Sequence, residues 1–262
     1  MFKRAPAPLE LVRDHPLSLL TGLRHRQSFA EIDRYLMFVG ASRSGHSLVG
    51  SLLNAHPDVV VAHQLHGLRY VAAGFNRTQL LGMILRTDRR YGRRGRVSNK
   101  GRYHYAVPGQ WQGRYRTLRF AGDKRGASSA TLLDQRPELL DRLRSVLGVP
   151  IRIVHVIRNP FDNIATMSIR FRFNLPEAGE RYFARARARA RATATASVRA
   201  TTADSEWLDL RHEDLIAHPP EQLGLLCRSL GSRPTNGMRT IVPASSTLAL
   251  IRVDSRSSGR TS

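Results

Sequence analysis

The sequence predicts a three-layer α/β/α fold with a mainly parallel sheet. Short apolar runs of strand length alternate with longer helical segments, and the alternation begins with Tyr35 to Val39 and Ser47 to Ala55. The first two runs are continuously apolar, which is typical of parallel strands that helices cover on both faces. A chain of 262 residues, of which 41% are hydrophobic, is long enough for one such domain.

One α/β domain is expected over residues 35–231. We expect residues 1–34 to form a proline-punctuated lead-in that contains one short helix. Periodicity fades after Gly231, so residues 232–262 are interpreted as an irregular C-terminal tail that is disordered at its end. Met1 to Leu20 has no continuous apolar stretch, and we therefore expect a cytoplasmic protein with no signal peptide and no transmembrane segment.

The elements of the first half follow from apolar runs and from the residues that end them. The strand at Tyr35 to Val39 ends at a glycine, and the leucines of the helix at Ser47 to Ala55 share one face before Pro57 stops it. Val59 to Ala62 is a second strand. Residues 86–117 are rich in Arg, Gly and Tyr and show little periodicity, so we expect a long surface excursion over the active face.

In the second half the pattern predicts further strands and helices. The strands are expected at 118–121, 151–157 and 207–210, and the helices over about 130–147, from about 162 and over 221–230. Residues 184–196 alternate Ala with Arg and then Ala with Thr. Because Ala and Arg both favour helix, we expect a solvated helix there.

The formal charge of +22 comes almost entirely from arginine. A basic surface attracts phosphates, sulfated saccharides, anionic membranes or nucleic acid, or arginine merely fills positions where lysine would serve. No recognition-helix, RNP or zinc-finger pattern is present, so no specific nucleic-acid partner is predicted. The single cysteine, Cys227, excludes an internal disulfide and a cysteine-built zinc site, and its apolar neighbours indicate a core residue.

A phosphate-binding loop is predicted at Gly40 to Ser47. Its spacing is that of a P-loop, GxxxxGK[ST], with His46 in place of the lysine. Glycines allow a tight turn, backbone N–H groups converge, and the helix N-terminus adds partial positive charge. Side chains that can add hydrogen bonds there are Ser42, Arg43, Ser44 and Ser47. The absent lysine argues against hydrolysis of ATP or GTP. The alternative is a glycine turn that opens a helix.

A second anion site is predicted where the strand at Ile151 to Ile157 ends. Arg158 follows it directly, Asn159-Pro160 turns the chain into a helix, and Thr166 adds a hydroxyl on that helix. Ligands bind at the carboxyl ends of strands in open α/β sheets, and an arginine fork donates two hydrogen bonds to one phosphate. The alternative is an ordinary strand–turn–helix in which an Asn or Asp side chain caps the helix.

These two motifs together resemble the donor-binding motifs of the sulfotransferase family, whose donor is 3′-phosphoadenosine 5′-phosphosulfate (PAPS). The residues that match the family's 5′-phosphosulfate loop are Arg43, Ser44, Gly45, His46 and Ser47. Arg158 matches the arginine of the 3′-phosphate motif, and Thr166 takes the place of its serine. The resemblance covers residues 36–231. It implies a P-loop NTPase-like fold, PAPS as cofactor, and transfer of a sulfuryl group to a hydroxyl or amine.

The resemblance also implies catalytic residues. Lys124 follows a predicted strand and matches the lysine that the family places beside the leaving sulfate. The general base departs from the family, because Gly126 stands where cytosolic members have a histidine and Gln64 where others have a glutamate. A glutamine amide cannot accept a proton, so either His63 or His66 is the base, or the protein is catalytically impaired.

The sequence leaves the base and the function open in several respects. Asp123 is a further candidate for the base. No metal site is predicted, because His63 and His66 have no visible cluster of further ligands. The main competing function is a P-loop kinase-like or inactive nucleotide-binding protein, and only the charge suggests a nucleic-acid-binding module. The expected acceptor is a small molecule, a saccharide or a lipid, with the aromatic residues of 86–117 as candidates for its wall.

Overall fold

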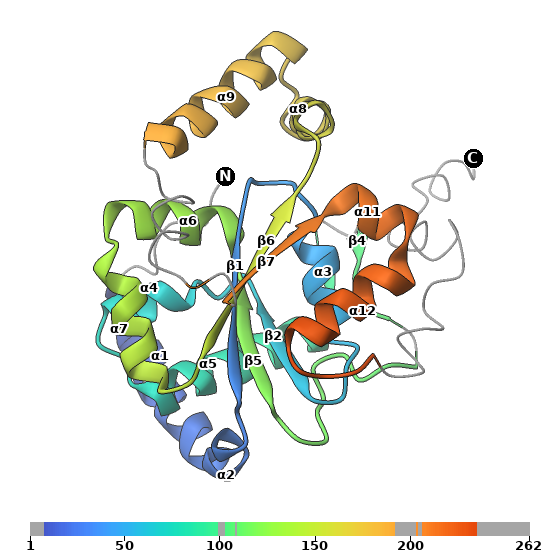
Figure 1. Cartoon of the computed structure of the whole chain (residues 1–262). Helices are drawn as coiled ribbons and strands as arrows, with labels where there is room; N and C mark the ends of the chain where they lie inside the picture. The colour runs from blue at the N-terminus through green and yellow to red at the C-terminus, as the bar shows by residue number, and fades with distance from the viewer. Residues whose placement is uncertain (1–7, 99–102, 108, 192–202, 204–205, 235–262) are drawn as a thin grey trace, which may run out of the picture.

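The computed structural model describes residues 8–98, 103–107, 109–191, 203 and 206–234. Its centre is a five-stranded sheet in which every neighbouring pair of strands is parallel (Figure 1). Across the sheet the strands are β2 (Val59–His63), β5 (Phe120–Lys124), β1 (Arg34–Val39), β6 (Ile151–Ile157) and β7 (Trp207–Arg211). Helices cover both faces, which confirms the predicted three-layer α/β/α fold with a parallel sheet.

Both faces of the sheet are apolar, because successive strand residues point to opposite sides and each side packs on helices. Tyr35 and Met37 of β1 point into one core, and Leu36 and Phe38 point into the other. The first core lies under α4 (Gly67–Ala72), α5 (Arg77–Arg93), α6 (Gly126–Gln135) and α7 (Glu138–Leu147). The second lies under α3 (His46–Leu53), α11 (His212–Ala217) and α12 (Pro219–Ser229). Cys227 is buried in the second core, as predicted.

The segment before β1 differs from the prediction of one short helix. Helix α1 (Pro8–Arg24) has 17 residues and packs along α5, and α2 (Arg26–Ala30) follows it. The packing is close, since a Cβ on Gly82 of α5 would lie 2.6 Å from the carbonyl oxygen of Ser18. The prediction treated the prolines as helix breakers. A helix tolerates proline in its first turn, where Pro8 lies, and α1 also continues through Pro16.

The prediction of one irregular excursion at 86–117 is wrong for its first part. Helix α5 continues to Arg93, and the strands β3 (Val97–Ser98) and β4 (Tyr103–His104) then pair antiparallel. Helical periodicity is hidden in this stretch because arginines occupy the outer positions of α5, while its inner positions end with the buried Asp88.

Two further boundaries differ from the sequence prediction. The helix expected over 130–147 is two helices, α6 and α7, which break beside Pro137. The strand expected at 118–121 lies instead at residues 120–124, so Lys124 is the last residue of β5 rather than part of a following loop. The strand direction therefore fixes where the Lys124 side chain points.

Helices α8 (Pro160–Phe171) and α9 (Leu175–Arg191) stand out beyond the end of β6 and pack on each other (Figure 1). The residues buried between them are Ile164, Met167 and Ala178. The helix expected in the Ala–Arg stretch is present up to Arg191, and residues 192–196 lie outside the described residues, as does the predicted tail from 235. Among the helices described, none is long and apolar enough to cross a membrane.

Candidate functional site

The predicted phosphate loop joins the carboxyl end of β1 to the first turn of α3. Gly40 and Gly45 have φ angles of 125° and 99°, in the region that favours glycine. A Cβ on Gly40 would lie 2.6 Å from the carbonyl oxygen of Val156 on the neighbouring strand. A loop that turns this tightly from a strand into the first turn of a helix is the kind whose backbone N–H groups bind phosphate.

The side chain of His46 lies beneath the loop. Its Nε2 is 3.0 Å from the carbonyl oxygen of Val39, its ring packs edge-on against Phe38, and the residue is 8% exposed. The ring also fills the space beside Gly126, where a Cβ would collide with it. His46 can therefore offer a ligand its backbone N–H rather than its ring, and it does not replace the lysine of a P-loop.

Lys124 reaches the phosphate loop from the end of β5. Its Nζ donates a hydrogen bond of 2.8 Å to the Oγ of Ser47, 77 positions away in the chain. Lys124 is 3% exposed, and burial lowers its pKa to about 7; the carboxylate of Asp123 opposes this change, while Arg125 and Arg43 reinforce it. An ammonium group held here without water is suited to the charge of a bound anion.

Arg158 joins the loop to α8. Its Nη1 donates a hydrogen bond of 3.1 Å to the carbonyl oxygen of Arg43, 115 positions away, and lies 3.5 Å from the Oγ1 of Thr166. The side chain of Asn159 caps α8 by accepting a hydrogen bond of 2.9 Å from the N–H of Phe161. The Asn159 cap is the ordinary strand–turn–helix feature named above as the alternative to an anion site. The structure also brings Arg158 into contact with the predicted phosphate loop.

The side chains of the loop differ in what they can offer a ligand. Ser44 is fully buried, and its Oγ accepts a hydrogen bond of 3.4 Å from the Nδ2 of Asn163, so its side chain holds the loop against α8. Ser42 and Ser47 are half-buried. The Nε of Arg43 is buried and has no hydrogen-bond partner among the described residues. A buried donor without an acceptor is costly, and Arg43 therefore suits a site that a bound anion completes.

His63 is the last residue of β2 and lies beside Lys124, because the two residues are partners in the register of β2 and β5. Its ring stacks on Tyr91, with the ring centroids 4.0 Å apart and the planes at 10°. His63, Lys124 and Ser47 line one cleft at the carboxyl end of the sheet. The residues that line this cleft are Ser47, Gly50, Ser51, Asn54, Val61, His63, Tyr91, Arg96, Tyr105 and Lys124.

His66, the other histidine expected as a base, does not line this cleft. It is 2% exposed, and burial lowers its pKa to about 3, with the positive charges of Arg125 and Arg69 acting in the same direction. A ring with so low a pKa is a poor proton acceptor at neutral pH. Of the two predicted histidines, only His63 shares a cleft with Lys124.

Asp123 points to the opposite face of the sheet from Lys124, since neighbouring strand residues alternate. Burial raises its pKa to about 6, and its two oxygens accept hydrogen bonds of 3.1 Å from the N–H of Leu65 and 2.6 Å from that of Gly67. These bonds shape the turn in which the exposed Gln64 has a φ of 67°. The geometry argues against Asp123 as the base and gives it a structural role.

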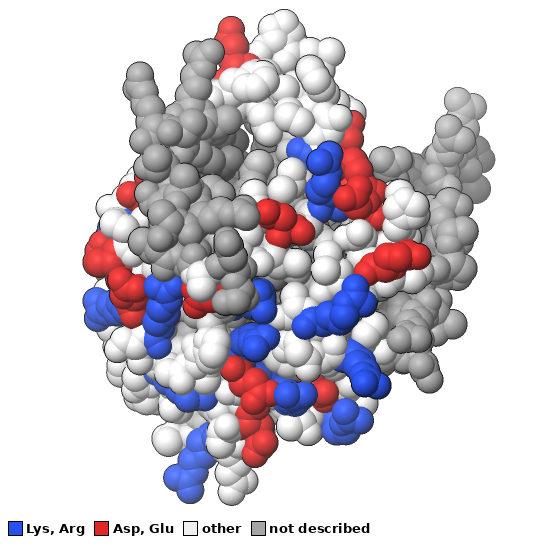
Figure 2. Space-filling view, in the orientation of Figure 1, with Lys and Arg blue, Asp and Glu red and all other residues white. Residues whose placement is uncertain are grey.

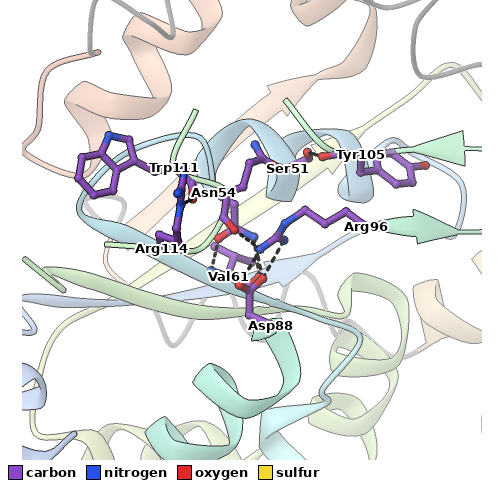
Figure 3. A network of polar contacts seen from close by, with 9 residues as sticks. Ser51, Asn54, Val61, Asp88, Arg96, Tyr105, Trp111 and Arg114 are labelled. Carbon is purple, nitrogen blue, oxygen red and sulfur yellow. Dashed lines mark hydrogen bonds and ion pairs between the residues drawn. The ribbon is translucent and has the colours of Figure 1, made fainter. Parts of the chain in front are cut away.

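A buried ion pair holds the wall segment, by which we mean the described residues between Arg94 and Thr117, against the cleft (Figure 3). Arg96 donates hydrogen bonds of 2.9 and 2.7 Å to the two oxygens of Asp88, and the two side chains are 5% and 2% exposed. Arg96 also donates to the carbonyl oxygen of Gln112. This pair spans α5 and the wall segment and fixes one against the other.

Asn54, at the end of α3, ties the same ion pair to the sheet (Figure 3). Its Nδ2 donates to the carbonyl oxygen of Val61 at 2.9 Å and to Asp88 at 3.2 Å, and its Oδ1 accepts from the N–H of Val61 at 2.7 Å. Ser51 of α3 donates to the carbonyl oxygen of Tyr105. The sequence did not predict this network, although Asp88 is the only acidic residue between Asp58 and Asp123.

The described residues also bear on metal binding and on nucleic-acid binding. Across the described ranges, no three His, Cys, Asp or Glu side chains gather where they could hold a metal ion. On the face drawn in Figure 2, lysines and arginines are interspersed with aspartates and glutamates rather than gathered into one basic patch. That face does not have the continuous basic stripe that is typical of nucleic-acid-binding proteins.

Comparisons with known proteins point to one family. A sequence profile of the sulfotransferase family matches residues 36–235. The sulfotransferase domain of the olefin synthase from Synechococcus PCC 7002 is similar, with a TM-score of 0.51 and 16% identity over 86% of this chain and 82% of that domain. A sulfotransferase from Mycobacterium tuberculosis H37Rv is also similar, with a TM-score of 0.46 and 14% identity over 86% of this chain and 74% of that protein. At these identities the likeness concerns the fold. A search of curated protein sequences finds no match.

Proposed function

Because the chain belongs to the sulfotransferase family, we propose that it transfers a sulfuryl group from PAPS to a hydroxyl or amine acceptor. One observation carries this proposal: Arg158 bonds to the backbone of Arg43, and Lys124 bonds to Ser47, at the same loop. Three cationic side chains from three separate strand ends therefore meet at the edge of the sheet where ligands of α/β proteins bind.

The residues at this edge fit a nucleotide that is anionic at both ends. The loop N–H groups, the Nε of Arg43 that lacks a partner among the described residues, Ser47 and Lys124 would hold the 5′-phosphosulfate. Arg158 and Thr166 would hold the 3′-phosphate. When bound, PAPS supplies the sulfuryl group and a phosphate leaving group.

Lys124 is the residue we assign to the leaving group. Its proton, held at Nζ, stabilises the negative charge that develops on the bridging oxygen, and the buried surroundings strengthen that interaction. The hydrogen bond to Ser47 fixes the direction of the ammonium group. Because the pKa of Lys124 is about 7 in the unliganded protein, a bound anion raises it and keeps the group charged.

His63 is the residue we assign as general base. The neutral imidazole would take the proton from the acceptor hydroxyl while that oxygen forms its bond to sulfur. The register of β2 and β5 places His63 beside Lys124, and the stack on Tyr91 holds the plane of the ring. His66, whose pKa burial lowers to about 3, lies outside the cleft and is not suited to this step.

The wall segment supplies the acceptor side of the cleft in this proposal. Arg96 and Tyr105 line the cleft opposite the end of β5, and the buried pair with Asp88 fixes their backbone. An aromatic wall suits a hydroxyl-bearing small molecule, a saccharide or a lipid head group. The acceptor is therefore best sought in a panel that covers these three classes.

The second candidate is a nucleotide-binding protein without turnover. The observation that favours it is that Gly126 and Gln64, at the two positions where family members carry a base, have no group that accepts a proton. A kinase-like function has less support, because the ring of His46 lies beneath the loop and cannot reach a γ-phosphate.

A transfer assay with sulfur-labelled PAPS separates these candidates. We expect label to move to at least one member of an alcohol, saccharide and lipid panel, and PAPS but not ATP to raise the melting temperature. Arg158→Ala should weaken PAPS binding by about 10- to 100-fold, since it removes charge-assisted hydrogen bonds. PAPS binding without transfer to any acceptor class would support the inactive protein. Unchanged PAPS binding by Arg158→Ala would refute the assignment of the nucleotide site.

A further inference from the structure

Helix α1 turns mainly small and polar side chains toward the protein, together with Leu11, which packs against the first core. Asp14 and Ser18 on this inward face are 6% and 0% exposed. Gly22 lies so close to α5 that a Cβ there would come within 2.6 Å of Thr78. The carboxylate of Asp14 accepts a hydrogen bond of 2.8 Å from the hydroxyl of Tyr70. A surface helix normally packs its apolar stripe inward and its polar face outward, so α1 is reversed with respect to that pattern.

The outward face of α1 carries large apolar side chains instead. Leu9, Val12, Leu20 and Leu23 are 82%, 71%, 67% and 59% exposed. With Pro16 and Leu19, positions 9, 12, 16, 19 and 23 follow the alternating steps of three and four that form the seam between paired helices. Single exposed leucines are ordinary on a protein surface, whereas a continuous stripe of them marks an interaction surface.

Four residues of the stripe are placed symmetrically about Pro16, whereas the position symmetric to Leu19 is Arg13. Leu9 and Leu23 lie seven positions to either side of it, and Val12 and Leu20 lie four positions to either side. Two α1 helices that cross antiparallel at Pro16 would place Leu9 against Leu23 of the second copy, and Val12 against its Leu20. A two-fold interface requires self-complementarity of this kind. We propose that α1 is a dimerisation surface, which pairs antiparallel with α1 of a second copy of this chain.

The charges of α1 favour the same direction of pairing. Glu10 lies in its first turn and Arg24 in its last. Antiparallel pairing brings the acidic first turn of one helix to the basic last turn of the other, whereas parallel pairing brings like charges together. A partner of uniform negative charge, such as an anionic membrane, would face Glu10 as well as Arg13 and Arg24.

The expected dimer is weak. Two 17-residue helices form a small interface compared with the about 800 Å² per partner that stable complexes bury. We therefore expect a monomer–dimer equilibrium with a dissociation constant in the range of about 1 to 100 µM. None of the residues that line the cleft belongs to α1, so the dimer and the proposed transfer activity can be tested separately.

Sedimentation equilibrium of the full chain, over about 1 to 200 µM, measures this association. Val12→Glu and Leu20→Lys each place a charge at both Val12–Leu20 contacts of the dimer. Each should weaken association by about 100-fold. The double variant places Glu opposite Lys at both contacts and should restore association to within about tenfold of the original. Leu225→Glu, on the exposed side of α12, is the matched control and should leave association unchanged.

Two results would overturn the proposal. One is a monomer at every concentration, including the case of a monomer that floats with phosphatidylserine vesicles and loses this binding with Val12→Glu, because the stripe would then be a membrane surface. The other is a dimer that both single variants preserve. Cross-linking gives an independent check, since Leu9→Cys with Leu23→Cys should form disulfides between chains under oxidation, while the buried Cys227 should not.

Discussion

The two sides of the cleft are held in place by different means. Backbone conformation shapes the phosphate loop, through the positive φ angles of Gly40 and Gly45, and two side-chain hydrogen bonds from Lys124 and Arg158 tie it down. The wall segment depends on the buried pair of Asp88 and Arg96. The loop is held by individual hydrogen bonds to its backbone and to Ser47, whereas removal of one partner of a buried ion pair leaves a charge without compensation. The free energy of unfolding should therefore depend most on the ion pair that holds the wall segment, and the rate of transfer on the residues at the phosphate loop.

Asp88→Ala tests the wall and should have the largest effect on stability. It leaves the guanidinium of Arg96 buried and unpaired, and the free energy of unfolding should fall by about 3 to 5 kcal/mol. Urea denaturation followed by circular dichroism measures this. The matched control is Asp33→Ala, which breaks the exposed pair with Arg119 and should cost less than about 1 kcal/mol. An equal loss of unfolding free energy in the two variants would show that the buried ion pair of the wall segment contributes no more than an exposed one.

Lys124→Met tests the loop side and should have the largest effect on chemistry. The rate of transfer from PAPS should fall by about 10²- to 10³-fold, because the positive charge at the leaving oxygen is lost. Single-turnover assays with labelled PAPS measure this rate. A rate within threefold of the original would show that Lys124 has no part in the reaction.

The same variant should change how stability depends on pH. Burial holds the pKa of Lys124 at about 7 in the folded protein, below its ordinary value of 10.5. Between these values the unfolded chain binds a proton that the folded protein lacks, so this group makes the free energy of unfolding rise from about pH 7 to about pH 10.5. Lys124→Met lacks this rise. The stability of Lys124→Met relative to the original protein should be greatest near pH 6 and decline toward pH 10. If urea denaturation gave the same pH dependence for both proteins, the lowered pKa of Lys124 would be contradicted.

His63→Ala should reduce the transfer rate by about 100-fold and leave the affinity for PAPS unchanged, since we assign the ring to proton transfer and not to binding of the donor. Added imidazole should restore part of the rate. His66→Ala is the comparison variant, and it should affect stability more than the transfer rate, because the residue is buried outside the cleft. The reverse pattern, with His66 needed for turnover, would contradict our assignment of the base.

Gln64→Glu should have the smallest effect. The residue is exposed and does not line the cleft, so the transfer rate should stay within about twofold of the original. Steady-state kinetics with the best acceptor measures this. A tenfold gain in rate would mean that the side chain at position 64 reaches the acceptor, and that Gln64 limits the transfer rate of the original protein.

Local patterns carried most of what the sequence could predict. Strand, loop and helix at Tyr35 to Leu53 are contiguous, and so are β6 and Arg158, so their arrangement follows from residues that are neighbours in the chain. The sequence also predicted that the phosphate loop and Arg158 lie close together, because the carboxyl ends of parallel strands share one edge of the sheet. The fold class rests on the same patterns.

Non-local contacts and side-chain direction could not be predicted in this way. The pairing of Asp88 with Arg96 depends on where the wall segment returns to α5, and no spacing in the sequence encodes that return. Asp123 and Lys124 are adjacent, yet they point to opposite faces, because both belong to strand β5, whose start the sequence pattern placed two residues too early. Helix α1 was not predicted because prolines commonly mark loops and because its inner face is mainly small and polar, with Leu11 packed against the first core.

The contact between His46 and Gly126 links two positions that evolution cannot change independently. A side chain at position 126 would collide with the ring of His46. A single mutation of Gly126 therefore cannot introduce the histidine that the resemblance to cytosolic sulfotransferases implies for this position. A smaller residue at position 46 would have to come first or at the same time. Substitutions at the two positions are therefore expected to be coupled, which restricts where a catalytic base can be introduced.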